Sequence, residues 1–330
     1  MPTYNGEAFL DAAVASALGQ SYANIELLII DDASTDNTAE LARSIALRDH
    51  RVRFISNERN LGLVTNWNRC LLEARGKWIK FLFQDDILEL RCIEELVAAA
   101  ESGNASFVAC FRDFIFEGEV AQDLRSRYQD QAATLDAWYQ SPTKSPAQFA
   151  ALALAQPPRN LVGEPTVTMF KRELVWEIGL FDPALIHLCD AEYWLRLGTL
   201  AGLLMVRKKL ARFRVHGKST SSANASERLF RANSLDPLIM LFKELYARDY
   251  SIFRQSAEGA FDATGRAAEF WALCHHAKAH AQDAHSNGDD GPLKEWKAVC
   301  AQFPLFDRVP IHEAARRKLR RLAALLAGPR

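Results

Sequence analysis

Short apolar runs alternate with amphipathic stretches along the first 117 residues of the chain. The run at residues 25–32 is almost wholly apolar, as expected of a parallel strand that is buried on both faces. Strands are expected at residues 25–32, 52–57, 77–83 and 105–116. Helices are expected at residues 7–20, 34–50, 62–75 and 87–103. The alternation predicts an α/β fold with a doubly wound, mostly parallel sheet flanked by helices.

The same pattern divides the chain into four predicted segments. Residues 1–117 and 161–222 carry the strand–helix pattern and would form the two halves of one α/β domain. Residues 118–160 are rich in Gln, Ser, Pro and charges, which predicts a helical or loop excursion. Residues 223–330 have mostly helical spacing and would form a C-terminal extension.

Composition narrows the classes of function. The chain has 40 Lys and Arg against 41 Asp and Glu, so the basic surface typical of nucleic-acid-binding proteins is not expected. No apolar run is long enough to span a bilayer, and the N-terminus has no signal-peptide pattern. The six cysteines form no CxxC pair, which predicts reduced thiols. We therefore expect a cytoplasmic location, with peripheral attachment to the inner membrane face as the alternative.

Pairs of adjacent acids follow two of the predicted strands. Asp31 and Asp32 end the first run, and Asp85 and Asp86 follow the third. In an open α/β sheet, ligands bind beyond the carboxyl ends of the strands, where a carboxylate can accept hydrogen bonds from a base or a ribose. The alternative is that Asp31 or Asp32 caps the next helix.

The second acid pair is also a candidate metal site. Two neighbouring carboxylates raise each other's pKa unless a cation or a donor neutralises them. Hard oxygen ligands suit Mg²⁺ or Mn²⁺, so Asp85 and Asp86 could hold such an ion. For an isolated pair of acids, a solvated turn leading into the next helix is the favoured alternative.

Two later segments add candidate residues. Asp190 lies near a predicted helix start and is a candidate general base, because Glu192 points to a different helix face. Trp194 is a candidate sugar platform, with a core tryptophan as the alternative. Arg214 and His216 share one face of a predicted strand and could hold phosphate oxygens or a metal, or could end a solvated edge strand.

The order of the motifs is more specific than any one motif. The segments PTYNG, IDDASTD, NERNLG, GKWIKFLFQDD, DAEYWLRL and FRVHGKSTS follow one another along the chain. In this combination the sequence resembles family 2 glycosyltransferases of the GT-A fold, over about Met1 to Ser222. The resemblance implies that Pro2, Thr3 and Tyr4 lie in the nucleotide-binding loop.

The resemblance implies roles for the acids as well. Asp32 would hydrogen-bond the uracil of a UDP-sugar, and Asp31 would support that loop. The acidic motif of the family is often written D-x-D, and here it reads Gln84-Asp85-Asp86. Asp85 would face the ribose and the sugar, and Asp86 would ligate a Mg²⁺ or Mn²⁺ ion that bridges the diphosphate.

The implied activity is metal-dependent, inverting sugar transfer from a UDP-sugar to a hydroxyl of a glycan or lipid-linked acceptor in cell-surface polysaccharide synthesis. Asp190 would act as the catalytic base and Trp194 would lie on the acceptor side. Arg214 would contact the diphosphate, and His216 would contact the diphosphate or the metal. No nucleophilic Ser or Cys is required.

Two other classes compete with this interpretation. A non-catalytic nucleotide-sugar-binding or assembly subunit would keep Asp32 and Asp86 but would not need Asp190. Family members normally carry an apolar strand directly before the PTYN segment, and the expected first strand is missing from this chain. Its absence favours the non-catalytic binding subunit. A nucleotidyltransferase should show a Gly-rich phosphate loop, and the sequence has none.

The C-terminal tail combines leucines with a basic cluster within residues 315–328. The spacing predicts an amphipathic helix that either packs on the catalytic domain or lies on an anionic membrane. The basic residues are Arg316, Arg317, Lys318, Arg320 and Arg321.

Overall fold

Strands and helices alternate in the computed structural model, which describes residues 1–118, 122–156, 160–217, 229–257 and 259–307. The strands are β1 (Pro2–Thr3), β2 (Leu27–Asp31), β3 (Val52–Ser56), β4 (Trp78–Lys80), β5 (Ile87–Leu88), β6 (Phe107–Phe116), β7 (Thr143–Lys144), β8 (Thr168–Lys171) and β9 (Leu203–Val215). The helices of the first 117 residues are α1 (Leu10–Leu18), α2 (Thr38–Arg48), α3 (Leu63–Glu73) and α4 (Cys92–Ser102).

The remaining helices follow β6 along the chain. They are α5 (Gln122–Trp138), α6 (Pro146–Ala155), α7 (Leu174–Ile178), α8 (Cys189–Ala201), α10 (Asp236–Tyr246), α11 (Ser251–Ser256), α12 (Ala263–Ser286) and α13 (Gly291–Gln302). Short 3₁₀ turns cover Pro165–Val167, Arg248–Tyr250 and Pro304–Asp307, and a π-helical turn covers Arg231–Leu235. The segment 118–160, expected to be helix or loop, contains α5, β7 and α6.

The N-terminal sheet is parallel and has the strand order β1-β2-β3. All five residues of β2 are buried, which explains the apolar run Leu27–Ile30. Pro2 pairs with Ile30 and Thr3 pairs with Asp31. A two-residue strand therefore lies directly beside β2, at the place where the sequence was expected to lack a first strand.

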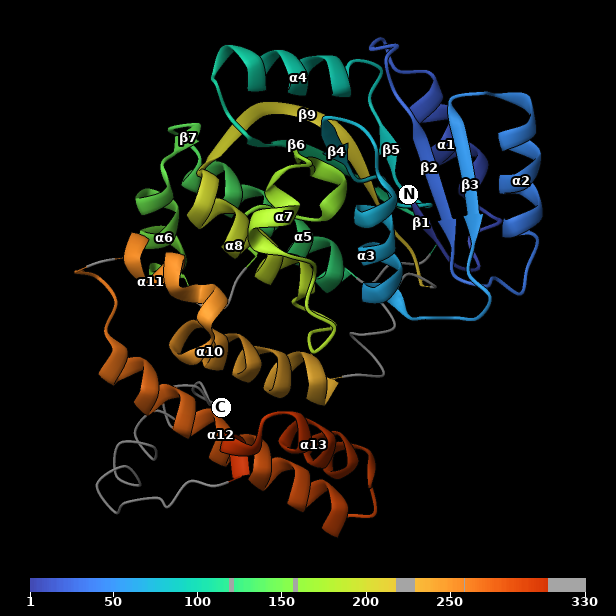
Figure 1. Cartoon of the computed structure of the whole chain (residues 1–330). Coiled ribbons are helices and arrows are strands. Elements are labelled where there is room, and N and C mark those ends of the chain that lie inside the picture. The colour runs from blue at the N-terminus through green and yellow to red at the C-terminus, as the bar shows by residue number, and fades with distance from the viewer. Residues whose placement is uncertain (119–121, 157–159, 218–228, 258, 308–330) are drawn as a thin grey trace.

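The second sheet is mixed and has the order β4-β8-β6-β9-β5, with β7 also paired to β9. The long strands β6 and β9 are parallel to each other, and β4, β5, β7 and β8 pair with their neighbours antiparallel. The parallel arrangement expected from the strand–helix pattern therefore describes β1–β3 and the β6–β9 pair. Helix α4 covers one face of this sheet, and α7 and α8 lie on the other (Figure 1).

The segment that carries the second acid pair differs from its predicted structure. The strand expected over residues 77–83 ends at Lys80 as β4. Phe81 and Leu82 are both buried, but they enter two different apolar clusters, so packing replaces strand pairing there. The helix expected from residue 87 begins only at Cys92, because Ile87 and Leu88 form β5.

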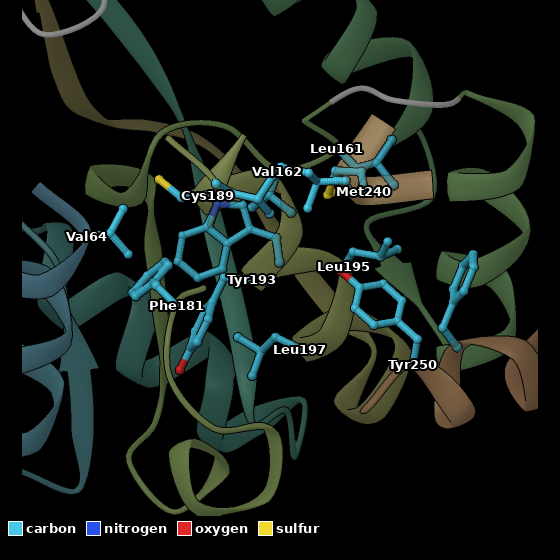
Figure 2. Close-up of a cluster of buried hydrophobic side chains, with 14 of the residues drawn as sticks. Val64, Leu161, Val162, Phe181, Cys189, Tyr193, Leu195, Leu197, Met240 and Tyr250 are labelled. Atoms are coloured by element: carbon cyan, nitrogen blue, oxygen red, sulfur yellow. The ribbon is translucent and has the colours of Figure 1, made fainter. Parts of the chain in front are cut away.

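One apolar core joins all four predicted segments. It contains Leu28, Tyr139, Trp194 and Phe270, one from each segment. Figure 2 shows its centre, where side chains from α3, α8 and α10 meet, among them Val64, Tyr193 and Met240. Helices α10, α12 and α13 form a layer beyond α8 (Figure 1).

All six cysteines are free thiols. Five of them are buried, and Cys300 is partly exposed. The expectation of reduced thiols, spread through the core, agrees with this arrangement.

A buried network of charges ties α8 to the C-terminal extension. Glu192 is fully buried and accepts hydrogen bonds from Arg196 at 2.8 and 2.9 Å, from Lys243 at 2.9 Å and from the Tyr250 hydroxyl at 3.0 Å. Burial alone would raise the pKa of Glu192, but the two cations hold that pKa below its usual value. The network fixes the helix that begins at Cys189.

Removing one donor from this network should destabilise the fold without abolishing it. Tyr250→Phe deletes the hydroxyl that donates to the charged Glu192, so the free energy of unfolding should fall by about 1.5–3 kcal/mol. Denaturant unfolding followed by circular dichroism would measure it. Tyr246→Phe, at an exposed tyrosine of α10, is the matched control and should change little. Equal stability of the two variants would contradict the proposed contribution.

Candidate active site

The first acid pair holds two loops at the carboxyl ends of β2 and β3. The two Asp31 oxygens accept hydrogen bonds from the Thr3 hydroxyl at 3.1 Å and from the backbone N–H of Ser34 at 2.9 Å. Asp32 accepts from the Asn57 amide at 2.6 Å and from the backbone N–H of Leu61 at 2.8 Å. The Asp31 contacts agree with its expected supporting role. The uracil contact expected of Asp32 stays a prediction.

Gln84 joins the N-terminal loop to the second acid pair. Its side-chain oxygen accepts the backbone N–H of Tyr4 at 2.8 Å, and its side-chain nitrogen donates to the Tyr4 carbonyl at 3.0 Å. A Cβ atom on Gly6 would lie 2.2 Å from the Gln84 side-chain oxygen, so glycine is needed for this close approach. Tyr4, which lies beside this pair of hydrogen bonds, is 46% exposed. Gln84 stands in the acidic motif, but nothing in the sequence indicated this contact with Tyr4.

Asp86 is enclosed by protein. The side chain is fully buried, Oδ1 accepts the backbone N–H of Arg214 at 2.9 Å, and Oδ2 accepts the Thr166 hydroxyl. Burial, and then the neighbouring charge of Asp85, raise the pKa of Asp86 well above its usual value. These contacts give Asp86 a structural position between the Pro165–Val167 turn and β9, which differs from the metal ligand expected of it.

Asp85 is the accessible acid of the pair. Its Oδ2 lies 3.1 Å from Nε2 of His216, and the two side chains are 20% and 12% exposed. One carboxylate and one imidazole fit a Mg²⁺ or Mn²⁺ ion that takes its other ligands from diphosphate oxygens and water. Within the described segments, no group of three or more His, Cys, Asp or Glu side chains could hold a metal. A metal at Asp85 and His216 would therefore depend on oxygens from the donor.

Arg214 lies behind this pair. Its Nε donates to the Asp85 carbonyl at 2.7 Å, and its guanidinium is paired with Glu117 and lies 4.9 Å from the Phe9 ring centre. The His216 ring packs on the same Phe9 ring with centroids 4.6 Å apart. The structure thus places Arg214 as a support for Asp85, and its expected contact with the diphosphate stays a prediction. Phe9 and Glu117 carry no motif, and nothing in the sequence indicated them.

Asp190 has the properties of a general base. Its Oδ1 accepts the backbone N–H of Ala191 at 2.7 Å, and its Oδ2 accepts the side-chain amide of Asn160 at 2.8 Å. Burial raises the pKa of Asp190 to about 7, with a smaller contribution from the charge of Glu164, although the two hydrogen bonds act in the opposite direction. A carboxylate with this pKa can take a proton near neutral pH.

The backbone before Asp190 is fixed by the C-terminal extension. Oδ2 of Asp236, the first residue of α10, accepts the backbone N–H groups of Ile186, His187 and Leu188 at 3.0, 2.6 and 3.1 Å. These contacts satisfy donors at the start of α8, as a capping side chain would. Asp236 was not among the residues that the sequence indicated.

Trp194 does not form the acceptor platform that the sequence suggested. The side chain is fully buried, stacks on Phe107 with centroids 5.7 Å apart, and donates from Nε1 to the Gly163 carbonyl at 3.1 Å. Position 194 lies on the face of α8 that packs against the sheet, so an acceptor cannot reach the ring. The core alternative holds.

The family of the chain follows from its sequence. A family model described as glycosyl transferase family 2 matches residues 1–179, more than half of the chain. This chain belongs to glycosyltransferase family 2. As a family 2 glycosyltransferase it is an enzyme, and this confirms both the resemblance and the enzyme class inferred from the motifs.

Relatives of this family 2 glycosyltransferase occur in several bacteria. An uncharacterized protein of Mycobacterium tuberculosis is 28% identical over 72% of this chain and 71% of its own length. An uncharacterized glycosyltransferase of Haemophilus influenzae is 28% identical over 66% of this chain and 65% of its own length. An Escherichia coli relative, named a UDP-Glc:alpha-D-GlcNAc-diphosphoundecaprenol beta-1,3-glucosyltransferase, is 37% identical over 33% of this chain and 42% of its own length.

Solved structures resemble this family 2 glycosyltransferase in fold. Staphylococcus aureus TarS in complex with UDP has a TM-score of 0.55 at 14% identity, covering 94% of this chain and 93% of that one. A mannosyltransferase of Pyrobaculum calidifontis in complex with GDP-Man and Mn²⁺ has a TM-score of 0.55 at 17% identity, covering 99% and 83%. These likenesses confirm the predicted GT-A fold.

The basic tail predicted at residues 315–328 lies outside the described residues. No helix in the described part of this family 2 glycosyltransferase combines the length and the hydropathy that crossing a bilayer requires.

Proposed function

We propose that the enzyme transfers a sugar, with inversion and with a divalent metal, from a UDP-sugar to a hydroxyl of a glycan or lipid-linked acceptor in cell-surface polysaccharide synthesis. The observation that carries the proposal is the double hydrogen bond between Gln84 and the Tyr4 backbone. It places the loop expected to bind the nucleotide directly beside the Asp85–His216 pair. A nucleoside diphosphate bound at this loop would therefore meet a metal ligand set.

The donor sugar nucleotide would bind at the two acid pairs. Asp31 holds the loop after β2, and Asp32 holds the loop after β3. Oδ2 of Asp32 accepts the Gly62 N–H at 2.9 Å, and its second lone pair is the candidate acceptor for the uracil imide. We assign the Mg²⁺ or Mn²⁺ to Asp85 and His216 rather than to Asp86, because Asp86 is fully buried and both its oxygens accept protein donors. When bound, the ion would neutralise charge on the leaving diphosphate.

The acceptor side depends on Asp190. Its carboxylate takes the proton from the acceptor hydroxyl while the hydroxyl oxygen forms a bond to the anomeric carbon of the donor sugar. The bond from that carbon to the diphosphate breaks, and the nucleoside diphosphate leaves with the electron pair. Attack opposite to the leaving group inverts the anomeric carbon, so no covalent sugar–enzyme intermediate is involved.

The choice of UDP rests on relatives. Solved complexes of TarS contain UDP and UDP-GlcNAc, and the Escherichia coli relative is named for UDP-Glc and a diphosphoundecaprenol-linked acceptor. The Pyrobaculum calidifontis enzyme, with GDP-Man, has the same fold, so the fold does not choose the nucleotide. These names support a UDP-sugar donor and a lipid-linked acceptor.

A donor screen tests the proposal. The full chain is incubated with each UDP-sugar, with GDP-Man as comparison, in Mn²⁺, in Mg²⁺ or in EDTA, and release of the nucleoside diphosphate is followed with and without added glycan acceptors. Release of UDP that requires a metal and increases with acceptor supports the proposal. Release of GDP alone, or equal release in EDTA, contradicts it.

We also propose that the basic tail contacts an anionic membrane surface, where a lipid-linked acceptor would be available. The support is the sequence of residues 315–328, in which five basic residues cluster between Arg316 and Arg321 beside leucines at helical spacing. Ending the chain before Arg316 should abolish sedimentation with vesicles that contain anionic lipid, and high salt should have the same effect on the full chain. Neutral vesicles are the control. Unchanged sedimentation of the shortened chain would contradict the proposal.

A further inference from the structure

Asn160 links the candidate base to a tight turn. Its Nδ2 donates to Oδ2 of Asp190 at 2.8 Å and to the Gly163 carbonyl at 3.0 Å. Its Oδ1 accepts the backbone N–H groups of Val162 at 3.0 Å and Gly163 at 2.8 Å. All four contacts come from one side-chain amide, so the position of its Nδ2 donor is set by the turn itself.

Helix α8 holds this turn at two points. Asp190 and Trp194 are four residues apart and therefore lie on one helix face. Asp190 binds Asn160, and Trp194 Nε1 donates to the Gly163 carbonyl at 3.1 Å. Gly163 has a φ of 118°, which favours glycine, and a Cβ atom there would lie 3.1 Å from the Arg112 guanidinium. The turn therefore has little freedom to move away from the carboxylate.

Among the residues that the structure describes, few charged or titratable groups surround the Asp190 carboxylate. Glu164 follows the turn and opposes ionisation of Asp190, although the Glu164 carboxylate is itself paired with Arg112 of β6. On α8 the neighbour is the buried Cys189 thiol, whose pKa is raised by burial. Neither group donates a hydrogen bond to Asp190. The Asn160 amide is the side-chain donor that favours the ionised form.

We propose that Asn160 is a positioning residue for Asp190: its amide orients the carboxylate toward the acceptor and favours the ionised form that is ready to take the proton. The inference rests on the proposed function, because it requires Asp190 to be the base. A hydrogen bond to the charged form of an acid lowers its pKa, so loss of this donor should shift proton abstraction to higher pH.

Asn160→Asp tests the donor while preserving the turn. The new side chain can still accept the N–H groups of Val162 and Gly163, but a carboxylate oxygen replaces the amide that faces Asp190. In the wild type, kcat/KM should rise with pH through about 7, since the base must lose its proton. In the variant this rise should move up by about one pH unit or more, and transfer at pH 7 should fall about fivefold or more, as the ionised fraction of Asp190 falls.

Two further variants separate positioning from a general effect on the fold. Asn160→Ser keeps a hydroxyl acceptor for the turn but is too short to reach Asp190, so the pH profile should shift without an added charge. Trp194→Phe removes the Nε1 bond to the Gly163 carbonyl and leaves Asn160 in place. It should lower the melting temperature and shift the pH profile less than Asn160→Ser does, because the Asn160 donor itself remains.

The outcomes are distinguishable. An unchanged pH profile and kcat in folded Asn160→Asp and Asn160→Ser, together with an inactive Asp190→Asn, would overturn this inference alone. A shift of equal size in Trp194→Phe would also overturn it, because the turn and not the amide would then be responsible. Full transfer by Asp190→Asn would instead show that the base assignment, and with it the proposed function at this residue, is wrong.

Discussion

Asp190→Asn should lower the rate of sugar transfer by about 10²–10⁴-fold, the usual contribution of a positioned general base. Asn has the same shape as Asp and can still accept the Ala191 N–H, but it cannot take a proton from the acceptor hydroxyl. Initial rates of UDP release with acceptor present would measure the loss. Donor binding, followed by calorimetry with UDP and Mn²⁺, should stay the same because Asp190 has no assigned contact with the nucleotide.

Asp136→Asn, which removes a carboxylate on the protein surface, is the matched control for Asp190→Asn. Asp136 is half exposed and forms a surface pair with Arg207 at 2.8 Å, so Asp136→Asn should leave both transfer and donor binding unchanged. The two variants differ from the wild type by the same chemical change. Equal rates in Asp190→Asn and Asp136→Asn would mean that another group accepts the proton.

Asp85→Asn should remove the dependence of transfer on Mn²⁺ or Mg²⁺ and lower the rate in the presence of metal by about 10²–10³-fold. The expectation corresponds to several kcal/mol of charge stabilisation by a bound ion. Because the Asp85 side chain is partly exposed, the fold should tolerate the change. Metal titrations of UDP binding and of transfer, with the melting temperature measured in parallel, would test this.

Asp86→Asn is the control from the same motif. The new amide side chain would still accept the Arg214 N–H and could meet the Thr166 hydroxyl, so a loss of about 1–3 kcal/mol in unfolding free energy and retained metal dependence are expected. The opposite result, with metal dependence lost in Asp86→Asn and kept in Asp85→Asn, would restore the assignment of the metal to Asp86.

Much of the fold was predictable from local pattern. Apolar spacing correctly predicted the positions of strands β2, β3 and β6 and of helices α1, α2, α3 and α8. In each of these segments the spacing of the apolar residues fits only one type of secondary structure. The antiparallel pairs of the second sheet were not predictable. Strand direction there depends on connections through residues 118–160, whose sequence has no strong periodicity.

The sequence predicted the positions of the acidic residues of the site, but not the residues that surround them. Asp190 lies at a helix start, and the pair Asp85–Asp86 follows a short strand, as the motifs indicated. The partners Thr166 and Asn160 come from segments 80 and 30 residues away from the acids they bind. Contacts between residues so far apart in the chain produce no recognisable pattern of residue spacing in a single sequence.

The sequence alone determined the family, the alternation of elements and the positions of the acids, because local apolar spacing and motif order are properties of the chain itself. The tertiary structure decided which of Asp85 and Asp86 is accessible. Neighbouring residues in a turn point in different directions, and the Pro165–Val167 turn and β9 enclose one carboxylate while the other faces His216. Packing from distant segments likewise decided that Trp194 lies in the core, since burial depends on what covers a residue and not on the residue itself.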